Sequence, residues 1–280
     1  MPPTTSPGPC TSSPIDPPTE ADHVTTTDLE PIGQPAAARI LREAADRLIA
    51  TQAGAISAAA RLVADGLRAG GLIQAFATGH SRSITAEIVG RAGGLVPANA
   101  LSIKDLVMYG GADPREILDP TVERDPSLAQ RILDLAEIHP SDVFVITSNS
   151  GGNGSVVEMA RLAKAGGHPL IAITSAEHSS QITSRHPSGQ RLFELADVVI
   201  DNGSPRGDAA LALPSGVRIT PTSSLTGVLI AQLLVTEVCG LLLASGEDVP
   251  VLVSANVPEG DAHNEALFAR YGTRLRPSEP

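Results

Sequence analysis

A run of hydroxyl and glycine residues at positions 148–155 has the composition of a phosphate-binding loop. It reads Ser-Asn-Ser-Gly-Gly-Asn-Gly-Ser and joins an apolar run, residues 143–147, to a helix-like segment that begins at Val156. Glycines let backbone N–H groups converge on an anion, and a helix N-terminus adds partial positive charge. Serine hydroxyls donate further hydrogen bonds without adding charge. The loop therefore predicts phosphate binding, with an ordinary strand-to-helix turn as the alternative.

Three more polar clusters lie where predicted strands end or a predicted helix begins, at residues 78–81, 174–175 and 220–224. In a parallel sheet the carboxyl ends of the strands share one edge, and ligands bind there. Together with residues 148–155 these clusters predict a site for an anionic, polyhydroxylated molecule. The predicted binding residues are Gly79, Ser81, Ser148, Asn149, Ser150, Gly151, Asn153, Thr174, Ser175, Thr222, Ser223 and Ser224.

Short apolar segments alternate with helical ones along the chain, which is the pattern of strands buried on both faces. It predicts an α/β fold: a doubly wound, five-stranded parallel sheet flanked by helices, with a long N-terminal helix. The predicted strands are 72–77, 95–101, 143–147, 169–174 and 198–201, with 249–255 as a further candidate. The predicted helices are 36–69, 83–92, 127–137, 155–165, 222–244 and 262–270. Residues 102–126 and 202–221 are expected to be loops.

The Pro-, Thr- and Ser-rich residues 1–35 predict a disordered tail, and residues 36–280 a single domain. A net charge of −11, a pI near 5.0 and 2% aromatic residues argue against nucleic acid as a partner. Neither a secretory signal nor a membrane span is recognised, since residues 225–244 resemble a buried helix. With Cys10 and Cys239 as the two cysteines, these features predict a cytoplasmic protein without a disulfide framework.

The sequence predicts no cofactor. It has no Gly-x-Gly-x-x-Gly after the first strand and no Walker A lysine, which argues against NAD and ATP. The histidines show no zinc-type spacing, so no metal is predicted.

These motifs resemble the sugar isomerase, or SIS, domain family. The family signature Ser-x-Ser-Gly-x-Thr corresponds to residues 148–153, with Asn153 in place of the threonine, and Gly79-His80-Ser81 is similar to the family's first substrate loop. Residues 91–95 and 261–265 resemble a bacterial subgroup described only by its sugar isomerase domain. The resemblance covers about residues 40 to 260 and implies a five-stranded parallel sheet that binds phosphosugars or related carbohydrate derivatives.

Aldose–ketose isomerisation through an enediol needs a base, an acid and stabilisation of a developing oxyanion. The candidate catalytic residues are His80, Glu87, His263 and Glu265. The alternatives are a hydrogen bond to a neighbour for the first histidine, a surface or interface salt bridge for Glu87, and a solvated helix start for the last two residues. The resemblance implies that a catalytic glutamate of related isomerases and etherases aligns with Arg91, which argues against catalysis. Less specific candidates are the pairs Lys104–Asp105 and Arg206–Asp208, which could equally lie in surface turns.

The predicted function is therefore binding of a phosphosugar and its isomerisation. A phosphosugar lyase or etherase, or a non-catalytic sugar-phosphate sensor, remains the alternative. The apolar surface of helices 36–69 and 222–244 exceeds what one sheet covers, so a homodimer or larger homo-oligomer is expected. The family resemblance also implies that a neighbouring subunit can complete the site with groups such as His263 and Glu265.

Overall fold

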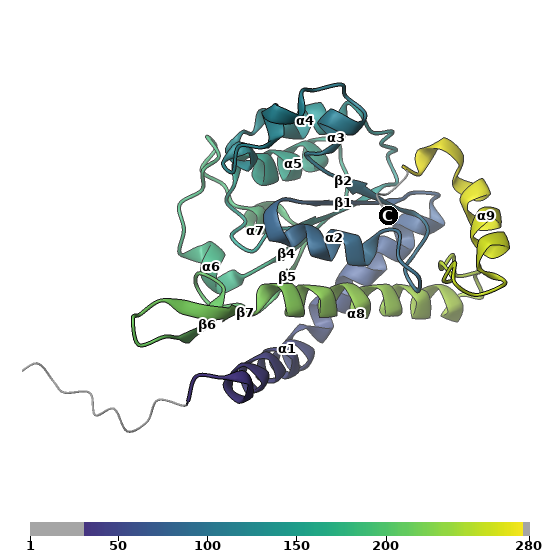
Figure 1. The fold of residues 1–280 in the computed structure, drawn as a ribbon. Coiled ribbons are helices and arrows are strands. Elements are labelled where there is room, and N and C mark those ends of the chain that lie inside the picture. The colour runs from purple at the N-terminus through teal and green to yellow at the C-terminus, as the bar shows by residue number, and fades with distance from the viewer. Residues whose placement is uncertain (1–30, 277–280) are drawn as a thin grey trace, which may run out of the picture.

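A computed structural model describes residues 31–276 and places a five-stranded sheet at its centre (Figure 1). All neighbouring strands pair in parallel, in the order β2-β1-β3-β4-β5. The strands are β1 (Ile73–Ala77), β2 (Ala98–Leu101), β3 (Val143–Thr147), β4 (Leu170–Thr174) and β5 (Val198–Asp201). The predicted fold class is confirmed, whereas residues 1–30 of the predicted tail lie outside the described residues.

Helices cover both faces of the sheet because the strand residues are apolar on both sides. On one face Ile73, Val143 and Ile171 pack against α1 (Gln34–Arg68), α2 (Arg82–Ile88) and α8 (Ser223–Ala244). On the other face Phe76 and Phe144 pack with residues of α4 (Ser127–Leu133), α5 (Gly154–Ala165) and α7 (Leu192–Leu195). Figure 1 shows the two helical layers below and above the sheet.

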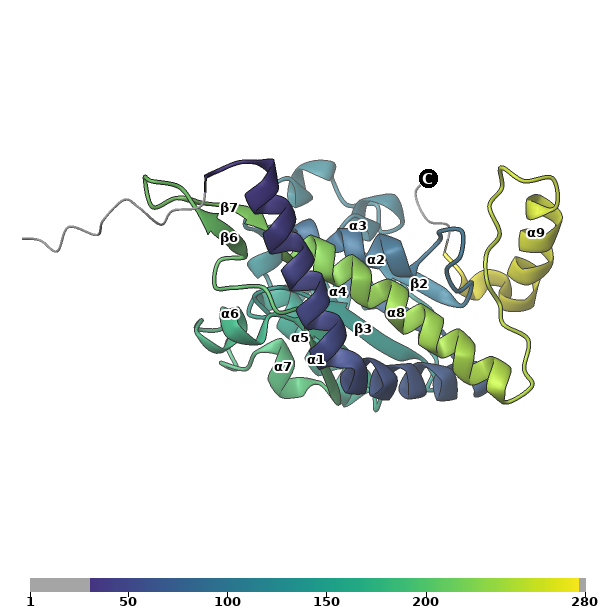
Figure 2. The same ribbon diagram turned by 90° about the horizontal axis from the view of Figure 1, so that it is seen from below.

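Helices α1 and α8 cross beneath the sheet and make extensive mutual contact (Figure 2). Among residues 31–276, α8 alone is long and apolar enough to cross a membrane, by length and composition only. Core helices of soluble proteins can pass the same test, and 39% of its most apolar window is buried in the structure. Several large apolar side chains remain exposed on these helices, namely Ile49, Leu225 and Leu243.

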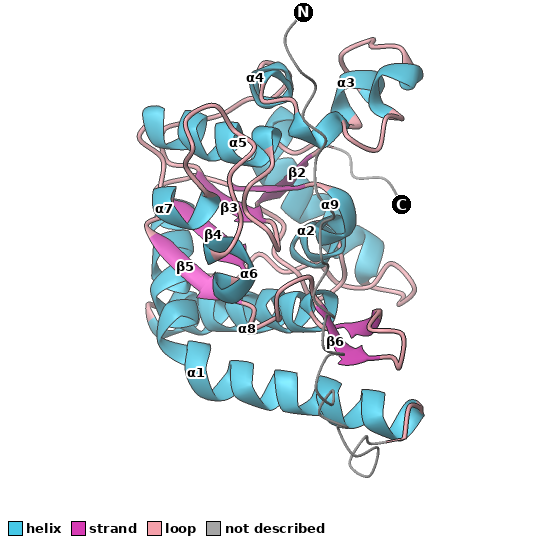
Figure 3. Ribbon diagram, turned by 90° about the vertical axis from the view of Figure 1, so that its left-hand side faces the viewer, coloured by secondary structure: helices cyan, strands magenta, loops and turns pink. Residues whose placement is uncertain are grey.

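The two segments predicted as loops contain regular structure, so those predictions were wrong in part. Within 102–126 the chain forms α3 (Asp105–Met108) and the 3₁₀ turns η2 (Pro114–Ile117) and η3 (Val122–Arg124). Within 202–221 it forms an antiparallel hairpin of β6 (Ala209–Ala212) and β7 (Arg218–Pro221), visible in Figure 3 beside α8. The chain between β4 and β5 also begins with a short helix, α6 (Ala176–Ser180).

The segment before β2 differs most from the prediction. Helix α2 ends at Ile88 rather than at residue 92, because Val89 is extended and Gly90 has a φ of 77°. Leu95 does not belong to β2 but pairs with Val251 in an isolated antiparallel bridge. Residues 249–255 therefore form no strand beyond that bridge. The last helix is α9 (Gly260–Tyr271), followed by the turn η4 (Gly272–Arg274).

Candidate functional site

The order of the strands defines a crevice between β1 and β3. The chain leaves β1 towards β2 on one side and later returns to β3 on the other, so the connections diverge at this pair. Ligands of doubly wound sheets bind at such a switch point, at the carboxyl ends of the strands. The loop after β1 contains η1 (Gly79–Ser81), and the loop after β3 is residues 148–153, so the two predicted motifs flank the crevice.

The loop after β3 has a fixed backbone. The Gly151 N–H donates to the Ser148 hydroxyl oxygen at 3.1 Å, and Gly151 has a φ of 63°, which favours glycine. A Cβ on Gly151 would lie 2.9 Å from the Ser179 Oγ, so a larger residue there would disturb the neighbouring helix α6. A Cβ on Gly154 would overlap the Arg124 carbonyl oxygen. Gly151 is thus required by turn geometry and close packing, and Gly154, the first residue of α5, by close packing.

Ser150 is the half-buried serine at the centre of this loop. Its hydroxyl has no hydrogen-bond partner among the residues that the structure describes, unlike that of Ser148. The 12-residue helix α5 begins four residues later. A donor held on a rigid loop beside a helix N-terminus is suited to an anionic group.

Three other predicted binding residues hold the sheet edge together. The Asn149 carbonyl oxygen accepts from the Ser175 N–H at 3.2 Å and from the Thr174 hydroxyl at 3.3 Å. Its side-chain oxygen accepts from Asn202 Nδ2 at 2.9 Å and from Ser204 Oγ at 2.7 Å. The Ser175 hydroxyl is buried and donates to the Ser204 carbonyl oxygen at 2.6 Å. Asn149, Thr174 and Ser175 therefore link the loop after β3 to the loops after β4 and β5.

Asn153, which replaces the signature threonine, bridges two charged side chains. Its Nδ2 donates to Glu123 Oε1 at 2.7 Å, and its Oδ1 accepts from an Arg185 guanidinium nitrogen at 2.9 Å. The side-chain amide is thus already engaged on both sides. In this arrangement Asn153 positions Glu123, and its binding of a ligand stays a prediction.

Glu123 is a candidate site residue to which no sequence motif points. It lies on η3, is half-buried, and its Oε2 would be 3.6 Å from a Cβ on Gly79. Its backbone oxygen accepts from the Ser155 hydroxyl at 2.7 Å. The preceding turn is fixed by Asp119, which accepts from the Thr121 N–H and hydroxyl; these bonds lower the pKa of Asp119. A carboxylate is thereby held between the loops after β1 and β3.

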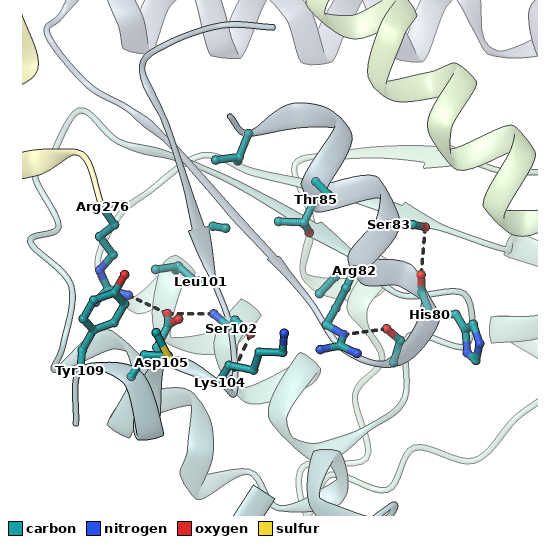
Figure 4. Close-up of a pocket in the computed structure, with 16 residues that line it drawn as sticks. His80, Arg82, Ser83, Thr85, Leu101, Ser102, Lys104, Asp105, Tyr109 and Arg276 are labelled. Carbon is teal, nitrogen blue, oxygen red and sulfur yellow. Dashed lines mark hydrogen bonds and ion pairs between the residues drawn. The ribbon is translucent and has the colours of Figure 1, made fainter. Parts of the chain in front are cut away.

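The loop after β1 opens into a cavity of about 800 Å³ between α2 and α3 (Figure 4). Gly79, with a φ of 58°, and His80 line it. The Arg82 Nε donates to the Gly79 carbonyl oxygen at 3.1 Å and keeps this turn closed. His80 is exposed, and the Ser81 hydroxyl has no partner among the described residues. His80 is therefore accessible to a ligand from the cavity.

In the predicted binding cluster at residues 220–224, the N-terminus of α8 is already capped by a side chain of the protein. Asp208, at a φ of 71°, accepts from the N–H groups of Thr222 and Ser223 at 3.1 and 2.8 Å and from the Ser223 hydroxyl at 2.6 Å. The Thr222 hydroxyl is buried without a partner among residues 31–276, and Ser224 is half-exposed. A carboxylate thus occupies this helix N-terminus. Arg206, the other residue of that predicted pair, is exposed.

Glu87 is bound to neighbouring side chains. It forms an ion pair with Arg91 and accepts from Gln232 Nε2 of α8 at 2.7 Å. It lies on the α8-facing side of α2 and is not among the residues that line the cavity. Glu87 therefore links α2 to α8 through a hydrogen bond.

His263 and Glu265 lie on α9, near the other end of the sheet. The His263 Nε2 is 2.9 Å from the Val251 carbonyl oxygen, and Val251 pairs with Leu95 ahead of β2. Both residues are exposed, and Figure 1 shows α9 set apart from the helices that cover the sheet. Within one chain they do not meet the loop after β3. The described residues also contain no cluster of three or more His, Cys, Asp or Glu suited to a metal ion.

The fold and its loop motifs define the class of the protein. The SIS domain family profile matches residues 38–175, across β1, β2, β3 and β4. The chain belongs to the UPF0309 family of SIS domain proteins. It is 38% identical to the UPF0309 protein GK1441 of Geobacillus kaustophilus over 218 residues, or 78% of this chain and 85% of the relative.

Two further similarities were found. The chain is 39% identical to the UPF0309 protein BH3325 of Halalkalibacterium halodurans over 83% of this chain and 93% of the relative. Among solved structures it is similar to a phosphoheptose isomerase from Francisella tularensis, with a TM-score of 0.49 and 15% identity. That similarity covers 73% of this chain and 95% of the isomerase.

Proposed function

We propose that this protein binds a phosphorylated sugar with the phosphate on the loop after β3 and interconverts its aldose and ketose forms. The observation that carries the proposal is the Ser150 hydroxyl, without a partner among the described residues, on a rigid glycine loop at the sheet's switch point. Ser81, on the loop after β1, also has a hydroxyl without a partner among the described residues and supplies a second neutral donor. Membership of the SIS domain family supports a carbohydrate derivative as the ligand.

Glu123 is the base in this proposal, because it is the carboxylate that the structure holds between the two loops. It takes the proton from C2 of the open-chain aldose, while His80 donates a proton to the carbonyl oxygen at C1. The resulting enediol then gives up its C2 hydroxyl proton and receives a proton at C1, which yields the ketose. Glu123 and His80 end in their starting protonation states, so no co-reactant is consumed.

The exposed apolar side chains of α1 and α8 support self-association in the cytoplasm, as a homodimer or larger homo-oligomer. In this arrangement α9 of one copy can approach the crevice of another, which is the remaining route by which His263 and Glu265 could contribute. Light scattering at micromolar concentration tests it: a monomeric mass would contradict self-association and leave Glu123 and His80 as the catalytic pair.

A non-catalytic sugar-phosphate sensor is the second candidate, and one observation favours it. Arg91 occupies the position expected for a catalytic glutamate of related enzymes, and it also pairs with Glu87. A lyase shares the first step, the removal of an acidic proton, and differs in the second, in which a substituent leaves. The three functions differ in what they do to the C2 hydrogen and to the carbon skeleton.

The test uses proton exchange. A library of aldose and ketose phosphates is first screened by thermal shift, because a ligand stabilises the native state to which it binds. The best ligand is then incubated with the protein in D₂O, and NMR follows the C2 proton if it is an aldose or the C1 protons if it is a ketose. An isomerase exchanges such a proton and forms the paired sugar, and a lyase releases a substituent. Binding without any exchange would reject both enzymes and leave the sensor.

A further inference from the structure

The cavity between α2 and α3 has a charge that neither the loop motifs nor the proposed chemistry explains. Among the described residues, three cationic side chains line it, Arg82 from α2, Lys104 ahead of α3 and Arg276 from the C-terminal segment, and one carboxylate, that of Asp105. Its other walls are largely apolar, with Val89, Leu101 and Met108 among them. In a chain with a net charge of −11, this is a local excess of positive charge. Apolar walls strengthen the attraction between such cations and an anion.

Arg276 reaches the cavity because the C-terminal segment is anchored along the edge of the sheet. Asn99 of β2 donates from Nδ2 to the Arg274 carbonyl oxygen at 2.8 Å and accepts from the Arg276 N–H at 2.9 Å. The Arg274 guanidinium pairs at 2.6 Å with Asp142, which is fully buried. These bonds fix residues distant in sequence against the outer strand, so Arg276 is a built part of the cavity wall.

The guanidinium of Arg276 is held in place but not fully used. One nitrogen donates to Asp105 Oδ2 at 2.6 Å, and the group lies over the Tyr109 ring, 5.3 Å from its centroid. The other terminal nitrogen is buried and has no hydrogen-bond partner among the described residues. The Asp105 carboxylate also accepts from the Ser102 N–H at 3.0 Å, so it is hydrogen-bonded to the loop after β2 as well as to the arginine. In Figure 4 the Lys104 side chain extends towards Arg82, across the cavity from Arg276.

We propose that this cavity binds a second negatively charged group of the ligand, so that the substrate is a phosphosugar with another acidic group remote from its phosphate. The inference rests on the proposed phosphate site after β3. Gly79 lines the cavity and also adjoins Glu123, which contacts Asn153 of the loop after β3, so one ligand can extend from the loop into the cavity. Guanidinium groups bind carboxylates and phosphates through paired, charge-assisted hydrogen bonds, which gives this end of the ligand specificity.

Three open-chain probes test the proposal by isothermal titration of the full chain. Glucitol 6-phosphate carries one anionic group, whereas 6-phosphogluconate and glucitol 1,6-bisphosphate carry a second at the other end of the same carbon chain. None has an aldehyde or ketone group, so none isomerises during the titration. We expect at least one doubly anionic probe to bind about tenfold or more tightly than glucitol 6-phosphate, as one charge-assisted interaction implies.

Variants show whether the cavity causes the tighter binding of the doubly anionic probe. Arg82→Gln and Lys104→Gln should each reduce the affinity ratio between the doubly and singly anionic probes by about fivefold or more, as loss of one charged contact implies. Arg115→Gln should leave this ratio unchanged. Arg115 is a fitting control because it is 86% exposed and pairs with Asp113 outside the cavity. Arg276 is not replaced, since its loss would leave the buried carboxylate of Asp105 without its ion-pair partner. Equal affinity of the wild-type protein for all three probes would overturn the second anionic site but not the phosphate site. If none of the probes binds, the proposed function fails, and this inference fails with it.

Discussion

Replacement of Ser150 by alanine separates ligand binding from folding. The Ser150 hydroxyl has no partner among the described residues, and the side chain is half-buried, so its removal leaves no buried group unpaired. We expect the free energy of unfolding to change by less than about 0.5 kcal/mol. A hydrogen bond to a charged group contributes about 1.5–3 kcal/mol, so the dissociation constant for a sugar phosphate should rise about 10- to 150-fold.

The assay is calorimetric titration with the sugar phosphate found by thermal shift, paired with urea unfolding. Ser215→Ala is the matched control, because Ser215 is an exposed serine in the turn between β6 and β7. Gly151→Ala is unsuitable, since a φ of 63° and a Cβ 2.9 Å from Ser179 Oγ would also destabilise the fold. If Ser150→Ala binds with wild-type affinity, the loop after β3 does not hold the phosphate and the reasoning from its geometry is wrong.

Three further predictions follow from individual contacts. Glu123→Gln keeps an oxygen for Asn153 Nδ2 but removes the base, so C2 exchange in D₂O should slow by about 10²- to 10⁴-fold; Glu116→Gln, on the exposed turn η2, should exchange at the wild-type rate, and undiminished exchange in Glu123→Gln would remove Glu123 from the mechanism. The Cβ of Gly227→Ala would overlap Ile84, so this variant should lower the free energy of unfolding by about 1–3 kcal/mol. The Cβ of Gly240→Ala on the same helix meets nothing within 4 Å, so this variant should raise the free energy of unfolding by about 0.4–1 kcal/mol. Similar urea midpoints for the two variants would contradict this prediction. Burial raises the pKa of the Cys239 thiol and so lowers its thiolate fraction near neutral pH; in a Cys10→Ser variant iodoacetamide should modify Cys239 more slowly than a free thiol, and equal rates would show that Cys239 is accessible and ionised.

The fold was predictable where the apolar periodicity of a segment and the polar or glycine residues at its ends indicated the same bounds. The strands at 143–147 and 198–201 and the long helices α1 and α8 lie within a residue or two of their predicted bounds, because uninterrupted apolar patterns end at clear polar or glycine signals. The strand expected at 95–101 was too long, since Leu95 pairs with Val251 instead and β2 begins only after Pro97. That bridge joins residues far apart in the chain, which local pattern cannot reveal.

The candidate site was predictable only for its local motifs. The loops at 79–81 and 148–153 meet at the sheet edge as expected, since their positions follow from strand order. Glu123 and Arg276 were missed because each enters through contacts with residues distant in sequence, namely Asn153 and Asn99. Asn149, Thr174, Ser175 and Ser223 have the residue types of ligand donors, yet in the structure they bond to neighbouring loops. Residue type alone does not distinguish a donor to a ligand from a donor to the protein.

A crystal structure of the protein with the tightest-binding sugar phosphate from the thermal-shift screen tests the proposed phosphate site most directly. We expect the phosphorus atom within the loop after β3, with a phosphate oxygen about 2.5–3.0 Å from Ser150 Oγ, as a charge-assisted hydrogen bond requires, and C2 facing Glu123. A phosphate bound away from residues 148–154, with Ser150 still unliganded, would contradict it.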